Sequence, residues 1–232
     1  MNVLVRTLSE FMLFAGLDEQ SLAGIAPYIR ERTYNPGQII GFAGEPCEGV
    51  HLIVRGVVST RRLSIEGREY VLDYLSAGEC FDLVPVFDGR ESLATTEALT
   101  HAVTFFIPCD QFLSIVQNNE TVSRAAMSYL AVRVRYLSET VVDLALHTVR
   151  TRLARFLLAR INGSQETEAS GTPLARWTQE EIAAHIGTVR DVVGRTLRTF
   201  AREGIIRRER GMLVITDREQ LEQEAMQEEL SS

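Results

Sequence analysis

Near the C-terminus, three charged side chains stand close together in the stretch GTVRDVVGR, which runs from Gly187 to Arg195. Arg190 and Arg195 each carry a planar guanidinium group that can donate two parallel hydrogen bonds to the O6 and N7 atoms of guanine. Asp191 can accept a hydrogen bond from the amino group of cytosine. On a short helix, this set could read base edges in the major groove of DNA. The alternative is a solvated helix face that carries these charges by chance.

The residues around this stretch predict a helix-turn-helix. Thr178 and Glu181 have the spacing of a capping box, in which the Thr hydroxyl and the Glu carboxylate each accept a hydrogen bond from the other residue's backbone amide. A short helix should follow, and Gly187 should end it at a turn between two closely crossing helices. The second helix is expected from Arg190 to about Glu203. Its predicted inward face is formed by Val193, Leu197 and Phe200.

A basic hairpin should follow the second helix. Residues 204–215, GIIRRERGMLVI, predict two short strands around a basic turn, which is the wing of a winged helix. Arginines in this turn would contact phosphates, and such contacts add affinity and salt dependence rather than base selectivity. The full set of predicted DNA contacts is Arg190, Asp191, Arg195, Thr178, Thr188, Val189, Arg198 and Arg208.

The distribution of charge supports this interpretation, although the whole chain is acidic with a formal net charge of −7. Residues 150–211 carry 12 Arg and 7 Asp or Glu, whereas residues 1–149 carry 11 Arg and 18 Asp or Glu. Residues 212–232 carry 1 Arg and 6 Asp or Glu. The positive charge is therefore concentrated in the segment that contains the predicted helix-turn-helix, as expected if that segment alone meets an anionic surface.

The composition excludes several classes of protein. With 232 residues, of which 45% are hydrophobic and 24% charged, the chain is typical of a soluble globular protein with room for two domains. No apolar run approaches the roughly 20 residues of a membrane helix, and the start lacks the pattern of a signal peptide. We therefore expect a cytoplasmic protein with no membrane partner.

The cysteines indicate neither a disulfide framework nor a metal centre. Cys47, Cys80 and Cys109 are far apart and show no C-x-x-C spacing, which argues against a zinc site and an iron–sulfur cluster. Buried spectator cysteines are the simpler interpretation, and a single redox thiol is the alternative. The four histidines are scattered, so they do not offer the clustered ligands of a cupin-like enzyme, and no enzyme activity is expected.

Glycines recur regularly in the first part of the chain. Gly44, Gly56, Gly67, Gly78 and Gly89 form a series with intervals of 12, 11, 11 and 11 residues, and Gly49 falls inside the first interval. Between them lie β-rich runs at 50–54, 57–65 and 70–75. Short strands with evenly spaced turns predict an antiparallel barrel or roll. The spacing is compatible with a ligand-binding jelly roll of the cupin type and with any other all-β domain.

Residues 121–147 contain no Gly or Pro and predict one long helix. Apolar residues recur every seven positions in two series three places apart, which is the a/d pattern of a coiled coil. Branched residues at two a positions and Leu at every d position favour two parallel strands, and so a dimer. The alternative is a long helix that packs this stripe on its own domain. The predicted dimer contacts are Met127, Leu130, Val134, Leu137, Val141 and Leu144.

Together, these features resemble the Crp–Fnr family of bacterial transcription regulators over nearly the full length. Residues 13–26 resemble the family's first helix, the regular glycines its cyclic-nucleotide-binding roll, and residues 178–206 its DNA-reading helix-turn-helix. The resemblance implies an α+β fold with an N-terminal β-roll (jelly roll), a long dimerisation helix and a C-terminal winged helix-turn-helix. The expected boundaries of these three parts are 1–120, 121–147 and 148–232.

The resemblance also implies how DNA is read. Arg190, Asp191 and Arg195 match the three base-reading residues of the branch that resembles the catabolite activator, in which the middle residue is Glu. This match implies a homodimer on double-stranded DNA, at a palindrome with TGTGA-like half-sites. Paired helix-turn-helix units need half-site centres about one turn, roughly 34 Å, apart. RNA polymerase is the further partner that the family implies.

The nucleotide-binding residues of the predicted β-roll differ from those of the branch that resembles the catabolite activator. Where its cyclic-nucleotide sites carry a Gly-Glu pair and then an Arg-Ser pair, this chain has Asp82-Leu83 and about Ser92-Leu93. Burying a phosphate beside two leucines and without that arginine would cost more free energy than it gains, so we expect no cAMP binding. The predicted effector pocket is lined by Leu72, Leu75, Asp82, Leu83, Val84, Ser92, Leu93 and Leu137.

Such a pocket suits an apolar or aromatic effector, a haem, or no ligand at all, and these alternatives stay open. The positions of the haem ligands in the family's carbon-monoxide sensor hold Asp82 and Val84 here, so haem would need another ligand. The candidates are His51, His101 and His147. A signal in the roll would shift the long helices and so reposition the DNA-reading units. The expected hinge lies near His147-Thr148.

Overall fold

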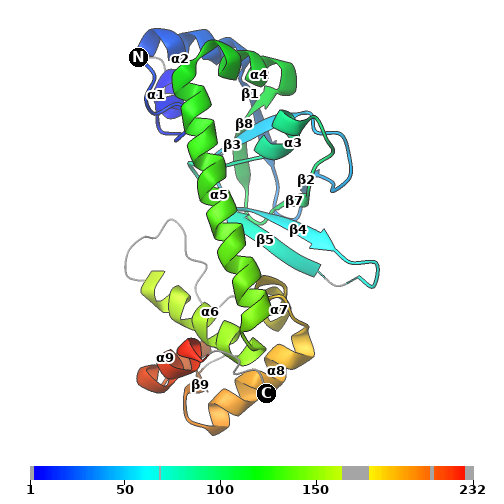
Figure 1. The fold of residues 1–232 in the computed structure, drawn as a ribbon, viewed down its shortest axis with the longest axis vertical. Helices are drawn as coiled ribbons and strands as arrows, with labels where there is room; N and C mark the ends of the chain where they lie inside the picture. Colours follow the sequence, from blue (N-terminus) through cyan, green and yellow to red (C-terminus); the bar gives the residue numbers. More distant parts are fainter. Residues whose placement is uncertain (1–2, 68, 164–177, 210–211, 228–232) are drawn as a thin grey trace. The chain divides into compact units, whose positions relative to one another are not determined.

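The computed structural model describes residues 3–67, 69–163, 178–209 and 212–227, and Figure 1 shows its elements in chain order. The chain divides into two compact units, residues 1–62 with 72–136 and residues 63–71 with 137–232. The first contains short helices and two antiparallel sheets, and the second contains helices and a two-stranded hairpin. The predicted α+β class is therefore confirmed.

Two four-stranded antiparallel sheets form the roll. Their strand orders are β1-β8-β3-β6 and β2-β7-β4-β5. The runs predicted at 50–54, 57–65 and 70–75 are confirmed as β3, β4 and β5. The strands are β1 (Arg30–Tyr34), β2 (Ile39–Gly41), β3 (Gly49–Arg55), β4 (Val58–Leu63), β5 (Glu69–Leu75), β6 (Cys80–Phe81), β7 (Thr95–Ala98) and β8 (Ala102–Pro108).

The regular glycines mark the ends of these strands. All five, from Gly44 to Gly89, have positive φ angles, which side chains with a Cβ rarely adopt. At Gly56 a Cβ would also lie 2.6 Å from the carbonyl oxygen of His101. Each interval between these glycines in the sequence therefore corresponds to the length of a strand together with its turn.

The helices of the first unit are α1 (Val3–Ser9), α2 (Glu19–Ile25), the 3-10 helix η1 (Ala26–Tyr28), α3 (Leu83–Asp88), α4 (Cys109–Asn118) and the first part of α5 (Glu120–Leu146). The helix expected over 13–26 is wrong in its first part, because residues 13–16 form a turn and residues 17–18 are not helical. The helix starts only after Asp18, whose carboxylate accepts a hydrogen bond of 2.8 Å from the Ser21 amide as an N-cap.

Two apolar clusters hold the first unit together. One fills the space between the sheet that contains β3 and β8 and the surrounding helices, with Leu8, Phe14, Leu52, Ile107, Phe112 and Val122 among its buried residues. The other lies inside the roll and contains Tyr34, Ile53, Val58, Leu75, Phe81, Ala98 and Ala102. Alternate residues of β3 serve the two clusters, as expected for a strand buried on both faces.

The long helix predicted at 121–147 is confirmed as α5, the green helix of Figure 1. Polar contacts join its first half to the roll. The Tyr129 hydroxyl donates a hydrogen bond of 2.7 Å to the Cys80 carbonyl. Arg133 forms an ion pair of 2.5 Å with Asp73 of β5, and both side chains are largely buried.

The second unit confirms the predicted helix-turn-helix and wing. After the last part of α5 it contains α6 (Val149–Gly163), α7 (Gln179–Ile186), α8 (Arg190–Arg202), β9 (Ile206–Glu209), β10 (Met212–Ile215) and α9 (Arg218–Met226). Its core includes Leu153, Leu157, Ile182, Val193, Phe200 and Leu221. The short helix expected in the acidic tail is α9. Most of the polar loop expected at 162–173 lies outside the described residues.

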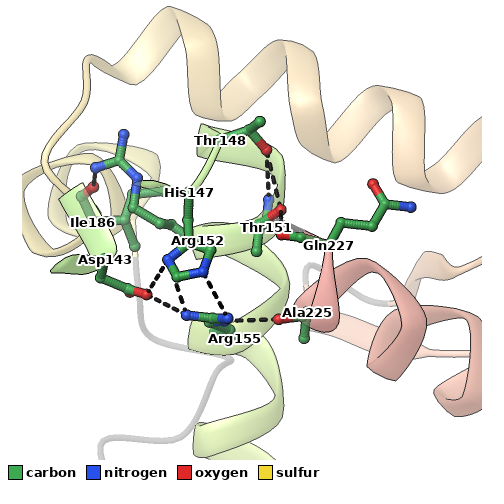
Figure 2. Close-up of polar contacts among 9 residues, drawn as sticks. All are labelled: Asp143, His147, Thr148, Thr151, Arg152, Arg155, Ile186, Ala225 and Gln227. Carbon is green, nitrogen blue, oxygen red and sulfur yellow. Dashed lines mark hydrogen bonds and ion pairs between the residues drawn. The ribbon is translucent and has the colours of Figure 1, made fainter. Parts of the chain in front are cut away.

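Polar contacts surround the junction of α5 and α6, the expected hinge (Figure 2). Arg155 of α6 pairs with Asp143 of α5, lies 3.2 and 3.1 Å from the two ring nitrogens of His147, and donates a hydrogen bond of 2.7 Å to the Ala225 carbonyl of α9. The Thr148 hydroxyl accepts a hydrogen bond of 3.1 Å from the Thr151 amide. The last turn of α5 is therefore fastened to α6 and α9.

The close approach of the β3 and β8 backbones at Gly49 leads to a prediction about stability. At Gly49, opposite Pro108, a Cβ would lie 2.2 Å from the Ile107 carbonyl oxygen, and backbone cannot move aside as a side chain can. We expect Gly49→Ala to lower the free energy of unfolding by about 1–3 kcal/mol. The control is Gly24→Ala on α2, where a Cβ meets nothing within 4 Å. Calorimetry should show a lower melting temperature for Gly49→Ala alone, and equal melting temperatures would contradict the close approach.

Candidate nucleic-acid interface and effector region

The first helix of the helix-turn-helix, α7, is capped at both ends. The Thr178 hydroxyl accepts from the Glu181 amide at 3.2 Å, and the Glu181 carboxylate accepts from the Thr178 amide at 2.6 Å, so the predicted capping box is present. Gly187 ends the helix with a φ of 66°. Arg152 of α6 donates to the carbonyls of Ile186 and Gly187, which satisfies groups that a helix end leaves open.

The second helix, α8, buries one face and exposes the other. Val193, Leu197 and Phe200 are at most 6% exposed, as predicted. Gly194 is also buried, and a Cβ there would lie 2.8 Å from the side-chain oxygen of Gln179, so the missing side chain lets α7 and α8 cross closely. These contacts fix which face of α8 points to solvent.

The three residues predicted to read bases lie together on that solvent face. Arg190, Asp191 and Arg195 are exposed, and their side chains form no hydrogen bond or ion pair with any described residue. At about 100° of rotation per residue they fall within an arc of about 140°, so one helix face presents all three. They are the first, second and sixth residues of α8, near the end that enters the major groove in helix-turn-helix proteins.

The other predicted contacts lie around this face. Thr178 and Val189 are exposed and Thr188 is half-buried. Arg198 is exposed, but its Nε donates a hydrogen bond of 3.0 Å to the Gly194 carbonyl of its own helix, which leaves the terminal nitrogens for a ligand. The Arg208 backbone pairs with β10, whereas its side chain lies outside the described part of the chain.

One arginine that sequence reasoning missed holds the far end of α8. Arg150 donates to Glu224 of α9 at 2.6 and 2.5 Å and to Glu203, the C-cap of α8, at 3.2 and 2.5 Å. Its guanidinium also lies 4.8 Å from the centre of the Phe200 ring. The hydrogen bonds to Glu224 and Glu203 raise the pKa of Arg150. No local motif in the sequence predicts these ion pairs, because Glu203 and Glu224 are 53 and 74 residues away from Arg150.

The residues predicted to line an effector pocket do not share one environment. Leu75 belongs to the cluster inside the roll, whereas Leu83 packs in the cluster beneath the helices. Ser92 is also buried and Leu72 is half-buried. By contrast, Val84, Leu93 and Leu137 are 40%, 53% and 41% exposed.

Asp82 stands at a strained position at the start of α3. Its φ of 63° makes it the only residue other than glycine with a positive φ in the described chain. Its side chain forms no capping hydrogen bond, and burial raises the pKa of its carboxyl group to about 6. The resemblance described above aligns Asp82 with the glycine of the family's Gly-Glu pair, and a left-handed backbone at that position suits a glycine.

The histidines considered as haem ligands are engaged with other groups. His51 is buried inside the roll, with its ring stacked 4.6 Å from Phe81 and its Nδ1 at 3.1 Å from the Thr104 hydroxyl. Burial, together with the charge of Arg32, lowers the pKa of His51 to about 3, so the ring is neutral at pH 7. His101 is exposed near Arg55. Across the described residues, no cluster of three or more His, Cys, Asp or Glu could hold a metal ion.

Comparison with known proteins identifies the architecture. The model of the cyclic nucleotide-binding domain matches residues 31–119, and the model of the Crp-like helix-turn-helix domain matches residues 151–224. A protein of Mycobacterium tuberculosis named CRP-like cAMP-activated global transcriptional regulator is 30% identical over 217 residues, which cover 92% of this chain and 96% of that protein. The chain belongs to the Crp–Fnr family of transcription regulators.

Further relatives support this Crp–Fnr assignment. The cAMP-activated global transcriptional regulator CRP of Salmonella typhimurium is 30% identical over 167 residues, which cover 70% of this chain and 78% of that protein. The crystal structure of a Crp–Fnr regulator from Eubacterium rectale has a TM-score of 0.78 and 25% identity, with 94% of this chain and 100% of that chain covered. This Crp–Fnr protein is thus a DNA-binding transcription regulator with a nucleotide-binding-like effector domain, and not an enzyme. Within the described ranges, no helix combines the length and the apolarity required to span a bilayer.

The buried carboxyl group of Asp82 in this Crp–Fnr regulator leads to a prediction about how the stability of the protein depends on pH. Because the pKa of Asp82 is about 6 in the folded protein and near 3.8 when unfolded, the folded state retains the proton longer. Asp82 should therefore reduce stability progressively as pH rises from about 4 to about 6, by on the order of 2 kcal/mol. We expect Asp82→Asn to lack this loss and to be more stable than the parent at pH 7.

Urea unfolding at several pH values measures this difference. The control is Asp88→Asn, which changes an exposed carboxylate at the other end of α3 and should follow the parent curve. A constant difference in free energy between Asp82→Asn and the parent from about pH 4 to about pH 7 would show that the buried carboxyl group does not titrate as inferred.

Proposed function

We propose that this protein is a homodimeric transcription regulator that reads a TGTGA-like palindrome with its two α8 helices, under the control of a signal in the β-roll other than cAMP. The observation that carries the proposal is the exposed set of Arg190, Asp191 and Arg195 on one face of α8, without partners among the described residues. The proposed parts are a sensor at 1–120, a dimerisation helix at 121–147 and a DNA-binding domain at 148–232. Its proposed partners are double-stranded DNA and RNA polymerase, and its place is the cytoplasm.

Base reading follows from the chemistry of the exposed set. Each arginine can present a forked pair of donors to guanine O6 and N7, and a good bidentate pair discriminates by about 1–3 kcal/mol. Asp191 can accept from a cytosine amino group on the opposite strand. The capped α7 and the buried face of α8 hold these side chains on a rigid element, so that little conformational freedom is lost on binding.

The first test replaces one arginine of the reading face. We expect Arg190→Ala to weaken binding to a TGTGA palindrome by about 1–3 kcal/mol, or roughly 5- to 150-fold, while non-specific binding changes little. Fluorescence anisotropy with the palindrome and with a scrambled duplex measures both affinities. The matched control is Arg124→Ala, which removes the same charge from an exposed arginine of α5. An unchanged preference of Arg190→Ala for the palindrome would refute the assignment.

The exposed stripe of α5 supports the dimer. Met127, Val134 and Val141 are 62%, 63% and 63% exposed at intervals of seven residues. Leu137 and Leu144 are 41% and 40% exposed, whereas Leu130 packs against the core of its own protomer. A soluble protein rarely leaves such a continuous apolar stripe open, and a second copy of the same helix would cover it.

The second test places a charge in that stripe. We expect Val134→Glu to weaken dimerisation by at least tenfold, because two carboxylates would face each other across the apolar seam. The matched control is Val132→Glu, which changes an equally exposed valine (61%) outside the a and d positions and should remain dimeric. Light scattering coupled to gel filtration gives the mass of each variant. Equal masses for the two variants at every concentration would contradict a seam along α5.

The identity of the effector is a separate question from how the protein reads DNA. The relatives from Mycobacterium tuberculosis and Salmonella typhimurium are named as cAMP-activated. In this chain Asp82-Leu83 and Ser92-Leu93 stand where the nucleotide-binding pairs are expected, which supports an effector other than cAMP. Calorimetric titration with cAMP should give no binding heat. The alternatives are haem, an apolar small molecule, or activity without an effector, and a Soret band in the absorbance spectrum of the purified protein would identify haem.

A further inference from the structure

Two of the cysteines, 62 residues apart in the chain, meet at one end of the roll. Cys109 is the first residue of α4 and directly follows β8, and Cys47 lies two residues before β3. Gly49 of β3 pairs with Pro108 of β8, and the Cys109 amide donates a hydrogen bond of 3.1 Å to the Glu48 carbonyl. The strand pairing thus continues to Glu48 and Cys109, and Cys47 lies one residue beyond the partner of Cys109.

The Cys109 thiol group contacts the backbone of Cys47. It donates a hydrogen bond of 3.2 Å to the Cys47 carbonyl oxygen. The Cys47 thiol faces the carbonyl oxygens of Gly49 and Asp82 at 3.6 and 3.9 Å. A disulfide forms where the Cα atoms of two cysteines are about 4.4–6.8 Å apart. Because the Cys109 sulfur already contacts the Cys47 backbone, we expect disulfide formation to require a change of side-chain rotamers.

Reagents in solution can reach this pair. Both cysteines are half-buried, at the rim of the apolar cluster beneath the helices. Their neighbours Pro46, Glu48 and Asp110 are exposed. The third cysteine, Cys80, is 4% exposed and serves as an internal comparison.

We propose that Cys47 and Cys109 are a dithiol modification site, which peroxide converts reversibly into an intramolecular disulfide. The Cys109 sulfur attacks one peroxide oxygen and the O–O bond breaks, which gives a sulfenic acid on Cys109 and one water. The Cys47 sulfur then attacks the sulfenic sulfur, the S–O bond breaks, and the hydroxide leaves as a second water with the thiol proton. Overall, one peroxide is reduced to two waters while two thiols are oxidised to one disulfide, and an added dithiol reverses the change.

The surroundings of the two cysteines indicate which one attacks the peroxide and which one resolves the intermediate. Burial raises the pKa of Cys47 to about 12, and burial also raises the pKa of Cys109. Cys109, however, is at the first position of α4, where unpaired backbone amides favour a thiolate, so it is the attacking cysteine and Cys47 resolves the intermediate. Because the thiolate is the reactive form, the reaction should accelerate as pH rises above neutral.

The disulfide would also change the start of α3. Oxidation removes the thiol hydrogen through which Cys47 contacts the Asp82 carbonyl. Asp82 holds a positive φ, a conformation that persists only where the surroundings enforce it. We therefore expect oxidation to loosen the first turn of α3, and so to carry a redox signal into the effector domain.

The sequence makes the cross-link easy to identify. The chain contains no lysine, so trypsin cuts only after arginine and places Cys47, Cys80 and Cys109 on the separate peptides 33–55, 69–90 and 91–124. Full-length protein is treated with hydrogen peroxide at about pH 7 and about pH 8.5, alkylated with N-ethylmaleimide, digested and analysed by mass spectrometry. We expect peptides 33–55 and 91–124 to be linked, faster at the higher pH, and to separate after dithiothreitol. Peptide 69–90 should be alkylated throughout.

Variants distinguish this pair from other chemistry. Cys80→Ser should form the same cross-link, whereas Cys47→Ser should form none and should accumulate a sulfenic acid on Cys109 that dimedone labels. Three alkylated peptides after peroxide treatment, a link that involves 69–90, or a link between two chains on a non-reducing gel would each overturn the proposal. Hydrogen exchange of peptides covering 82–89 should quicken on oxidation, and unchanged exchange would refute the coupling to α3. None of these measurements depends on DNA binding.

Discussion

The DNA-reading face depends on how the turn between α7 and α8 is closed. The last carbonyls of α7 have no partner within the helix, and the Arg152 guanidinium supplies one for Ile186 and Gly187. At Gly187, φ is positive and a Cβ would lie 2.6 Å from Leu144, so only glycine fits without displacing its neighbours. The direction in which α8 starts is therefore set by contacts with α5 and α6. Once its apolar face is buried, its charged residues can only point outward.

The proposed difference between this sensor and those of the cAMP-activated relatives centres on Asp82. Asp82 adopts the left-handed backbone that a glycine would take easily, and its buried carboxyl group is better accommodated with a proton. The connection between the roll and α5 is made by the chain's own groups, through Asp73 with Arg133 and Tyr129 with Cys80. These two contacts fasten the first half of α5 to the roll.

Local signals in the sequence were sufficient to predict the helices and strands. Contacts between segments far apart in the sequence could not be predicted from them. The Thr178 capping box, the regular glycines and the heptads each report on residues within a few positions of one another. The capping box, the strands between the glycines and the long helix were confirmed, whereas the dimer that the heptads predict stays a prediction. The helix expected from residue 13 was wrong because the Asp18 N-cap starts it later. The Arg150 ion pairs and the meeting of Cys47 with Cys109 could not be predicted, since both depend on where segments more than 50 residues apart come to lie.

The structure also changes how the positive charge of the C-terminal segment should be interpreted. Arg150 and Arg155 contribute to the excess of arginine, yet both form ion pairs inside their own unit, with acidic residues of α5, α8 and α9. Among the described side chains, those of Arg190, Arg195 and Arg202 on α8 are exposed and form no ion pair. Each phosphate contact that such a side chain makes contributes modestly at physiological salt. A single unit with so few contacts would bind DNA weakly. Joining two such units through α5 would make the second contact intramolecular and raise the affinity without any new interaction, which supports the proposed dimer on a palindrome.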